Sequence, residues 1–150
     1  MKIYIGADHN GFELKRELLD VLSAVGYEVI DEGGKVLRPD DDFPQFAARV
    51  VMAMKASDSQ DPRGILICGS GQGMCMAANR YKGIRASLAW SLEEARASRN
   101  DDDSNILCLP VRYISAKDAV KIAEAWLATP FAGAPRFKRR IKELDRLGEA

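Results

Sequence analysis

Two short segments of the 150-residue chain carry side chains that could do acid–base chemistry on a bound anion. Asp8 and His9 follow an apolar run near the N-terminus and supply a carboxyl group and the only imidazole of the sequence. Cys68 ends a second apolar run and opens the sequence Cys-Gly-Ser-Gly-Gln-Gly. The glycines let backbone N–H groups approach a ligand, and a helix that follows adds partial positive charge. Such a turn can hold an anion, or it can lower the pKa of Cys68 and make its thiolate a base or a nucleophile.

Each of these features also has a purely structural interpretation. A glycine-rich turn between a strand and a helix often serves close packing alone, and this one lacks both the complete dinucleotide-binding pattern and the Lys-Ser/Thr of a P-loop. A cysteine at the end of a buried strand is more often inert than reactive. Cys75 and Cys108 lie inside apolar runs, and we interpret both as structural. His9 is as well suited to a loop or cap as to a ligand contact.

The C-terminal segment, residues 136–147, is strongly basic and predicts a helix. Arg136 and Arg140 stand four residues apart, so both guanidinium groups can lie on one face of that helix. Two guanidinium groups on one face suit a phosphate, whereas the ordinary interpretation of a basic helix is a solvated surface.

The composition narrows the class of protein. Apolar residues make up 47% and charged residues 29%, which is typical of one globular domain with a real core. The 22 basic and 22 acidic residues cancel, which argues against a nucleic-acid partner or an anionic membrane surface. One histidine and three cysteines without a CxxC pair predict no metal site and no disulfide framework, and we expect no cofactor. Neither a signal peptide nor an apolar run of ~20 residues is recognisable, so we expect a cytoplasmic protein away from the membrane.

Short apolar runs alternate with segments of helical periodicity along the chain. The predicted strands cover residues 2–7, 27–30, 64–68, 84–89 and 105–109. The predicted helices cover residues 11–25, 44–54, 72–80, 91–99, 115–128 and 136–147. This order predicts a single α/β domain over residues 1–150: a Rossmann-like, doubly wound, five-stranded parallel sheet (an α/β/α sandwich) with a basic C-terminal helix. Because such folds bind ligands at the carboxyl ends of their strands, we expect residues 8–11, 68–73 and 100–103 to meet there.

Taken together, the sequence resembles the family of ribose-5-phosphate isomerase B and the galactose-6-phosphate isomerase subunits. The resemblance begins with Asp8-His9, the Cys68-Gly-Ser-Gly turn and the C-terminal arginine pair. Further matching segments are Gly11-Phe12-Glu13-Leu14-Lys15, Asp42-Phe43-Pro44, Ala77-Ala78-Asn79, Gly83-Ile84-Arg85-Ala86, Ser98-Arg99, Trp126-Leu127 and Thr129-Pro130-Phe131. They follow one another in unbroken order over nearly the whole chain, which is far more specific than any single motif.

The resemblance implies a metal-independent aldose–ketose isomerase of a sugar phosphate, of the ribose 5-phosphate/ribulose 5-phosphate type. In that family the position of Cys68 supplies the base that moves a proton from C2 to C1 through an enediolate. Ser70 stands beside the base, and Asp8 binds a substrate hydroxyl and aids proton transfer. Some members use a glutamate base at the position of Met74, and methionine cannot act as one, which favours Cys68.

The resemblance also implies the groups that bind the substrate. The backbone N–H groups of Gly69, Gly71 and Gly73 would stabilise the enediolate oxygen. The residues matching the family's phosphate ligands are His9, Arg112, Arg136 and Arg140. Members of the family are homodimers or tetramers with active sites shared between two chains. The helix over residues 136–147 is therefore expected to reach a neighbouring subunit.

One departure from the family concerns the groups that open the sugar ring. After Ser98-Arg99 the family carries a His-Asn pair, and here Asp101 replaces the histidine and Asp102 the asparagine. Asp101 could still act as an acid or base, but a charged Asp102 would repel an enediolate unless it is protonated or paired.

Three functions stay open after this replacement. The first is a working isomerase that uses Asp101. The second is an isomerase of a short or different sugar phosphate, such as a tetrulose 4-phosphate that needs no ring opening or a hexose 6-phosphate. The third is a sugar-phosphate-binding protein with impaired turnover, with a heteromeric partner supplying the missing groups as a variant.

Overall fold

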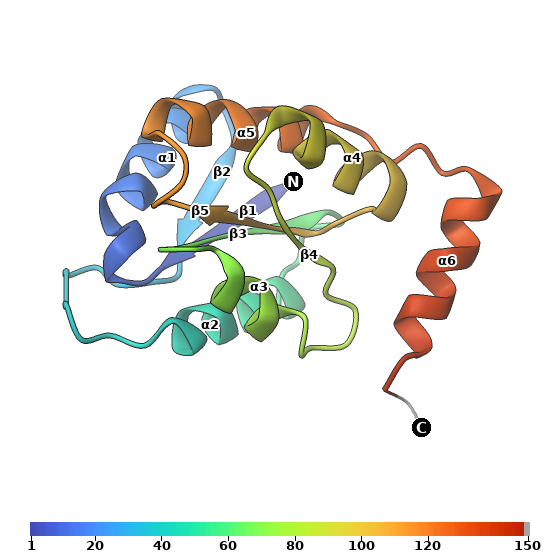
Figure 1. Ribbon diagram of the computed structural model, residues 1–150, viewed down its shortest axis with the longest axis horizontal. Helices are drawn as coiled ribbons and strands as arrows, with labels where there is room; N and C mark the ends of the chain where they lie inside the picture. The colour runs from blue at the N-terminus through green and yellow to red at the C-terminus, as the bar shows by residue number, and fades with distance from the viewer. Residues whose placement is uncertain (149–150) are drawn as a thin grey trace.

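The computed structural model describes residues 1–148, and strands alternate with helices through them (Figure 1). The strands are β1 (Lys2–Ala7), β2 (Glu28–Asp31), β3 (Pro62–Cys68), β4 (Ala86–Leu88) and β5 (Ile106–Pro110). The helices are a short 3₁₀ turn η1 (His9–Gly11), then α1 (Phe12–Ala24), α2 (Phe43–Lys55), α3 (Gln72–Ala78), α4 (Leu92–Asp102), α5 (Ala116–Ala128) and α6 (Pro135–Arg146).

The five strands form one parallel sheet in the order β2-β1-β3-β5-β4. Helices α1, α4 and α5 cover one face and α2 and α3 the other, so the predicted doubly wound fold is confirmed (Figure 1). The helix after β1 lies on the first face of the sheet, and the helix after β3 lies on the second face. A crevice therefore forms between the carboxyl ends of these two neighbouring strands, where ligands of such folds bind. The outermost strands, β2 and β4, are also the two shortest.

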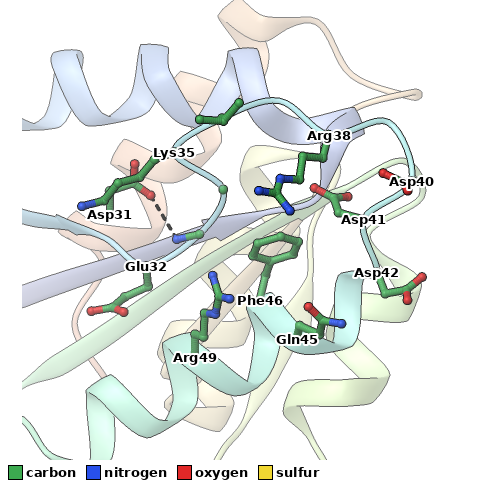
Figure 2. A pocket seen from close by; sticks show the side chains of 13 residues that line it. Asp31, Glu32, Lys35, Arg38, Asp40, Asp41, Asp42, Gln45, Phe46 and Arg49 are labelled. Atoms are coloured by element: carbon green, nitrogen blue, oxygen red, sulfur yellow. Dashed lines mark hydrogen bonds between the residues drawn. The ribbon is translucent and has the colours of Figure 1, made fainter.

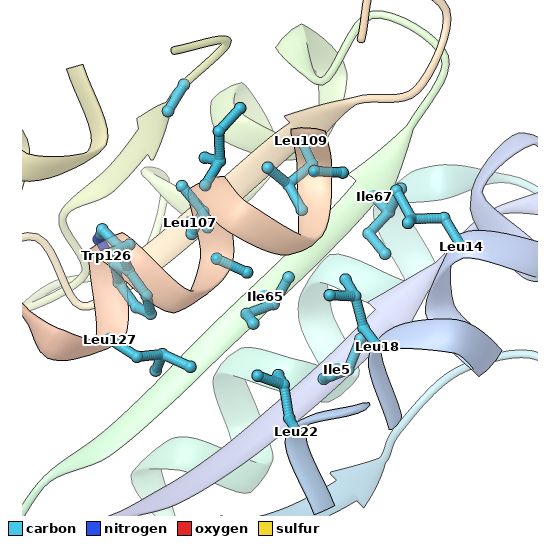
Figure 3. Close-up of a cluster of buried hydrophobic side chains, with 14 of the residues drawn as sticks. Ile5, Leu14, Leu18, Leu22, Ile65, Ile67, Leu107, Leu109, Trp126 and Leu127 are labelled. Carbon is cyan, nitrogen blue, oxygen red and sulfur yellow. The ribbon is translucent and has the colours of Figure 1, made fainter. Parts of the chain in front are cut away.

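Alternation along the central strands builds two separate cores. Ile65 and Ile67 point to the face of α1, α4 and α5, where Leu14, Leu18, Leu22 and Trp126 close the layer (Figure 3). Leu66 and Cys68 point to the other face, against side chains of α2 and α3. A strand buried on both faces has to be apolar at every position, which is why residues 64–68 read as one apolar run.

Helix α4 is longer than its sequence suggests. The predicted helix stops at residue 99, whereas α4 runs to Asp102 and ends at Asp103, whose φ is 47°. Arg99 donates to the Asp103 carboxylate at 2.8 Å, and the Ser104 N–H donates to the Ser98 carbonyl at 3.0 Å. These two contacts stabilise the extra turn. Residues 100–103 therefore lie before β5, at the amino edge of the sheet, and the prediction that they join the loops at the carboxyl edge was wrong.

Helix α6 stands apart from the sheet. It packs beside α4 at one end of the molecule, on the side opposite to the loop between β2 and α2 (Figure 1). The segment before it is tied to the end of α4, because the Ala132 N–H donates to the Asn100 carbonyl at 3.1 Å. Thus α6 starts from the amino edge of the sheet.

Candidate active site

Asp8 and Cys68 meet where the adjacent strands β1 and β3 end. Ala7 pairs with Ile67, and the Asp8 N–H donates to the Ile67 carbonyl at 3.2 Å, which brings the residues after the two strands together. Both side chains are buried. One Asp8 carboxylate oxygen caps the short turn η1 by accepting from the Asn10 N–H at 2.9 Å. Asp8 thus keeps an oxygen for a ligand beside the Cys68 thiol.

The glycines of the turn after Cys68 are required by packing. Gly71 has a φ of +72°, and a Cβ on it would lie 2.5 Å from Leu88 Cδ1. A Cβ on Gly73 would lie 2.7 Å from the ring of Phe43. The structural interpretation of this turn is therefore correct in part, since close packing alone accounts for these two glycines. The turn lies at the carboxyl edge of β3 and leads directly into α3.

Arg112 extends the site from the end of β5. Its backbone N–H donates to the Gly69 carbonyl at 3.0 Å, and its guanidinium lies so close that a Cβ on Gly69 would be 2.9 Å from Cζ. Ser70 lies on the same turn, and its hydroxyl accepts from the Gln72 N–H at 3.3 Å. A cation therefore lies against the turn that begins at Cys68.

His9 is held by an aspartate that the sequence analysis did not single out. The same Asp41 oxygen accepts from the backbone N–H of His9 and bonds its ring Nδ1, each at 2.9 Å. The pKa of His9 is raised, mainly by the hydrogen bond with Asp41. The negative charges of Asp8 and Asp41 also raise it, whereas partial desolvation lowers it. Asp41 lies 32 residues away in the loop before α2, and no spacing in the sequence connects it to His9.

A buried lysine anchors the loop that carries Asp41. Lys15 is 1% exposed, and its Nζ bonds Asp31 at 2.7 Å and the carbonyls of Gly33 and Gly34. Beyond this anchor the loop and α2 enclose an open pocket of about 700 Å³, lined mainly by charged side chains (Figure 2). The pocket borders the site, because Asp41 lines it and also contacts His9.

Eight of the predicted site residues lie at the carboxyl edge of the sheet and four do not. The eight at this edge are Asp8, His9, Cys68, Gly69, Ser70, Gly71, Gly73 and Arg112. The other four, Asp101, Asp102, Arg136 and Arg140, lie on α4 and α6. A seven-residue strand such as β3 spans ~20 Å. The end of α4 is therefore separated from Cys68 of the same chain by about the length of a strand, because the two lie at opposite edges of the sheet.

The carboxylates of Asp101 and Asp103, at the end of α4, have partners of their own. The Asn100 side chain donates to Asp101 at 2.7 Å, while Asp102 is exposed. Arg85 pairs with Asp103 at 3.3 Å and with Asp145 of α6 at 3.6 Å. Within one chain these groups link α4 to α6, and they do not approach the Cys68 turn.

Two further thiols lie near Cys68 on the same face of the sheet. A hydrogen bond with Cys108 lowers the pKa of the half-buried Cys75 to about 7, and burial raises the pKa of Cys108 well above its usual value. Cys75 also donates to the Ala86 carbonyl at 3.3 Å. All three cysteines are free thiols. The lowered pKa of Cys75 depends on a contact between α3 and β5, and the interpretation of Cys75 as structural stays a prediction.

Among residues 1–148 there is no group of three or more His, Cys, Asp or Glu side chains arranged to hold a metal ion. Within the same range, no helix is both long and apolar enough to cross a membrane.

Known proteins match the chain along nearly its whole length. A profile of the Ribose/Galactose Isomerase family matches residues 3–144. The chain belongs to this family. It is 41% identical over 137 residues to the probable ribose-5-phosphate isomerase B of Mycoplasma pneumoniae, which covers 91% of this chain and 89% of that one. It is 35% identical to the ribose-5-phosphate isomerase B of Mycobacterium tuberculosis, over all of this chain and 93% of that one.

Solved structures of the family share the fold as well as the sequence. Ribose-5-phosphate isomerase B of Clostridium thermocellum superposes with a TM-score of 0.93 at 40% identity, covering 99% of this chain and 98% of that one. The enzyme of Mycoplasma genitalium with bound ribulose-5-phosphate has a TM-score of 0.91 at 37% identity, covering 99% and 96%. The resemblance stated from the sequence is thereby confirmed, and the chain is an enzyme of the aldose–ketose isomerase type.

Proposed function

We propose that this isomerase interconverts a phosphorylated aldose and its ketose, with ribose 5-phosphate and ribulose 5-phosphate as the first candidates. The observation that carries the proposal is the meeting of Asp8, Cys68 and the glycine-rich turn at the ends of β1 and β3, with His9 and Arg112 beside them. A ribose-5-phosphate isomerase B that is 37% identical over nearly the same length binds ribulose-5-phosphate. A cytoplasmic location stays part of the prediction.

The proposed reaction is a proton transfer that needs no metal. The Cys68 thiolate removes the proton from C2, the C1 carbonyl oxygen takes up a proton, and an enediol(ate) forms. The thiol then returns a proton to C1 while the C2 hydroxyl loses its own, which gives the ketose with atoms and electrons unchanged in number. Asp8 and Ser70 are the groups placed to move the hydroxyl protons, and backbone N–H groups of the turn would stabilise the charged oxygen.

The phosphate would be bound by side chains of two chains. His9 and Arg112 lie at the carboxyl edge of the sheet, while Arg136 and Arg140 lie on α6, which starts from the opposite edge. Since α6 is remote from Cys68 of its own chain, its arginines can serve only the site of another copy. We therefore expect a homodimer or tetramer with shared active sites.

The same geometry places Asp101 and Asp102 outside the site of their own chain. If they take the part of the family's His-Asn pair, they act on a neighbour's substrate, as the α6 arginines do. The second and third functions described in the sequence analysis therefore stay open. The substrate could be a short or different sugar phosphate that needs no ring opening, or the protein could bind a sugar phosphate with impaired turnover.

A panel of substrates separates these functions. The protein is incubated in D₂O with ribose 5-phosphate, allose 6-phosphate, galactose 6-phosphate and a tetrulose 4-phosphate, and deuterium is followed by NMR at C2 of each aldose and at C1 of each ketose. Exchange with ribose 5-phosphate supports the first proposal, and exchange confined to the tetrulose supports the substrate without ring opening. Saturable binding with no exchange on any substrate would exclude both enzyme functions for the homomer.

A further inference from the structure

The loop between β2 and α2 contributes a side chain to the site that no family motif quoted above includes. We propose that Asp41 is the positioning residue that fixes the His9 ring and keeps it cationic for the substrate phosphate. This inference rests on the proposed function, because it gives His9 the task of binding the phosphate.

The geometry of the contact fixes both the backbone and the ring of His9. One Asp41 oxygen accepts from the backbone N–H and from Nδ1, each at 2.9 Å. The Asp41 side chain is 11% exposed and that of His9 is 33% exposed, so the contact is partly shielded while part of the ring stays open to a ligand. Because Nδ1 donates to Asp41, Nε2 is the only ring nitrogen left to donate to a phosphate. Asn10 lies beside it, with its amide nitrogen 3.3 Å from Nε2. An amide nitrogen only donates, so a protonated Nε2 has to release this contact before it donates to a phosphate.

The charges around the ring favour its protonated form. Asp8 precedes His9 on the chain, Asp41 faces it from the loop, and both raise its pKa. Arg38 lies near Asp41 on the loop (Figure 2), and Arg112 lies on the turn after β5 against Gly69. Both are cations and oppose protonation of the ring, but the hydrogen bond to Asp41 and the charges of Asp8 and Asp41 outweigh them, because the pKa of His9 is raised overall. The imidazolium therefore persists to higher pH than for a free histidine, and a cationic donor binds a phosphate dianion more tightly than a neutral one.

The loop is built to hold Asp41 in place. Its start is fixed by the buried Lys15, which bonds Asp31 and two glycine carbonyls. Its end is a turn within the loop, in which the Asp41 N–H donates to the Arg38 carbonyl at 3.3 Å, and the next residue, Asp42, is the N-cap of α2. Both supports lie outside the groups proposed to touch the substrate. A rigid support of this kind is what a positioning residue requires.

The single histidine makes the inference directly testable without any substrate. The protein is labelled with ¹⁵N in the histidine ring, and the one set of imidazole resonances is followed from pH 5 to 9 in the wild type, Asp41→Asn and Asp41→Ala. The control is Asp40→Asn, which removes one charge from the neighbouring position of the same loop, where no contact to His9 exists among the described residues. We expect the wild type to titrate above the ordinary histidine pKa and to show the Nδ1–H tautomer when neutral.

Both Asp41 variants should lower the pKa of His9, because both remove the negative charge. Asp41→Ala should also lose the tautomer preference, since an asparagine oxygen can still accept from Nδ1, while Asp40→Asn should leave the tautomer unchanged. Unchanged titration and tautomer in both Asp41 variants, with an unchanged amide spectrum elsewhere, would overturn the inference. A variant that loses its dispersed amide spectrum is replaced in this comparison by the other Asp41 variant.

A kinetic measurement separates this inference from the proposed function. For an active isomerase, Asp41→Asn should raise KM about tenfold at pH 7.5, the effect of one lost charge-assisted hydrogen bond, with kcat nearly unchanged. The rise in KM with pH should begin at lower pH than in the wild type. If no sugar phosphate is turned over but the NMR result holds, with weaker binding of inorganic phosphate to Asp41→Asn, the proposed function fails and the role of Asp41 stands. If turnover is normal and Asp41→Asn changes neither KM nor the titration of His9, the proposed function stands and the role of Asp41 fails.

Discussion

At the scale of single residues, the three cysteines show how much environment decides thiol chemistry. Cys68 and Cys108 are buried on the same face, and Cys75 is half buried beside them. Only Cys68 lies at the end of a strand next to Asp8 and the glycine-rich turn. It is therefore the thiol that can reach a ligand in the crevice.

Replacing Cys68 by alanine should lower the rate of C2 exchange by at least about 10²-fold, because a general base contributes roughly that much or more. The measurement is deuterium incorporation by NMR under saturating substrate. The matched control is Cys75→Ala, which removes a neighbouring thiol from the same cluster and should retain most of the activity. A fully active Cys68→Ala protein would refute the assignment of the base.

The lowered pKa of Cys75 predicts selective alkylation. Iodoacetamide reacts with thiolates, so labelling of the Cys75 peptide should rise through a midpoint at about pH 7, while buried Cys108 should resist labelling throughout the native range. Peptide mass spectrometry after a short pulse at each pH gives both profiles. Labelling of Cys75 that begins only above pH 9 would contradict the hydrogen bond with Cys108.

The contact between His9 and Asp41 also predicts a pH-dependent stability. A histidine whose folded pKa is raised contributes stability that is fully present below its unfolded pKa of ~6.5 and is lost as pH rises through the folded pKa. Asp41→Asn should therefore reduce the free energy of unfolding more at pH 6 than at pH 9. Urea unfolding of both proteins at the two pH values measures the difference, and an equal loss at both would contradict it.

At the scale of elements, the turn between β3 and α3 is the most constrained segment of the site. Gly71 combines a positive φ with a close approach to Leu88, while Gly83 has a φ of +80° but no neighbour within 4 Å of a built Cβ. The two glycines thus separate backbone strain from steric crowding.

Gly71→Ala should destabilise the protein by about 3 kcal/mol, because overpacking adds to the backbone cost. Gly83→Ala should cost only about 1 kcal/mol, from the backbone term alone. Urea unfolding gives both values at one pH. Equal losses for the two variants would show that Leu88 moves aside without strain.

The elements themselves could largely be predicted from the sequence, because each central strand is apolar on both sides and each helix has one apolar face. The position at which α4 ends could not be predicted from the sequence. Its last residues, Asn-Asp-Asp, have low helix propensity and read as a loop, whereas the ion pair from Arg99 to Asp103 stabilises the extra turn. Asp41 was missed for a similar reason, since its pairing with His9 depends on a loop path that no local pattern encodes.

At the scale of the whole molecule, the groups proposed for catalysis occupy two separate surfaces. One carries Cys68 and His9 at the carboxyl edge of the sheet, and the other carries Arg136 and Arg140 on α6. If both surfaces serve one site, as proposed above, that site needs two copies of the chain, each offering one surface to the other.

Mixing two inactive variants tests this arrangement. Cys68→Ala and the double variant Arg136→Ala/Arg140→Ala should each be nearly inactive alone, the second through a much higher KM. After unfolding and refolding together as a dimer, random assortment should restore about a quarter of the wild-type activity, because half of the dimers are mixed and each of these has one intact site. No recovery in demonstrably mixed dimers would place all the groups of one site in one chain.

The short outer strands of the sheet have a consequence for the protein at high concentration. β2 and β4 have four and three residues, so the sheet ends in few unpaired backbone groups. A long bare edge is the template on which foreign strands add and fibrils begin, and this sheet offers almost none. Copies of the chain must therefore associate through helices and loops, and crowding favours discrete assemblies over open-ended aggregates.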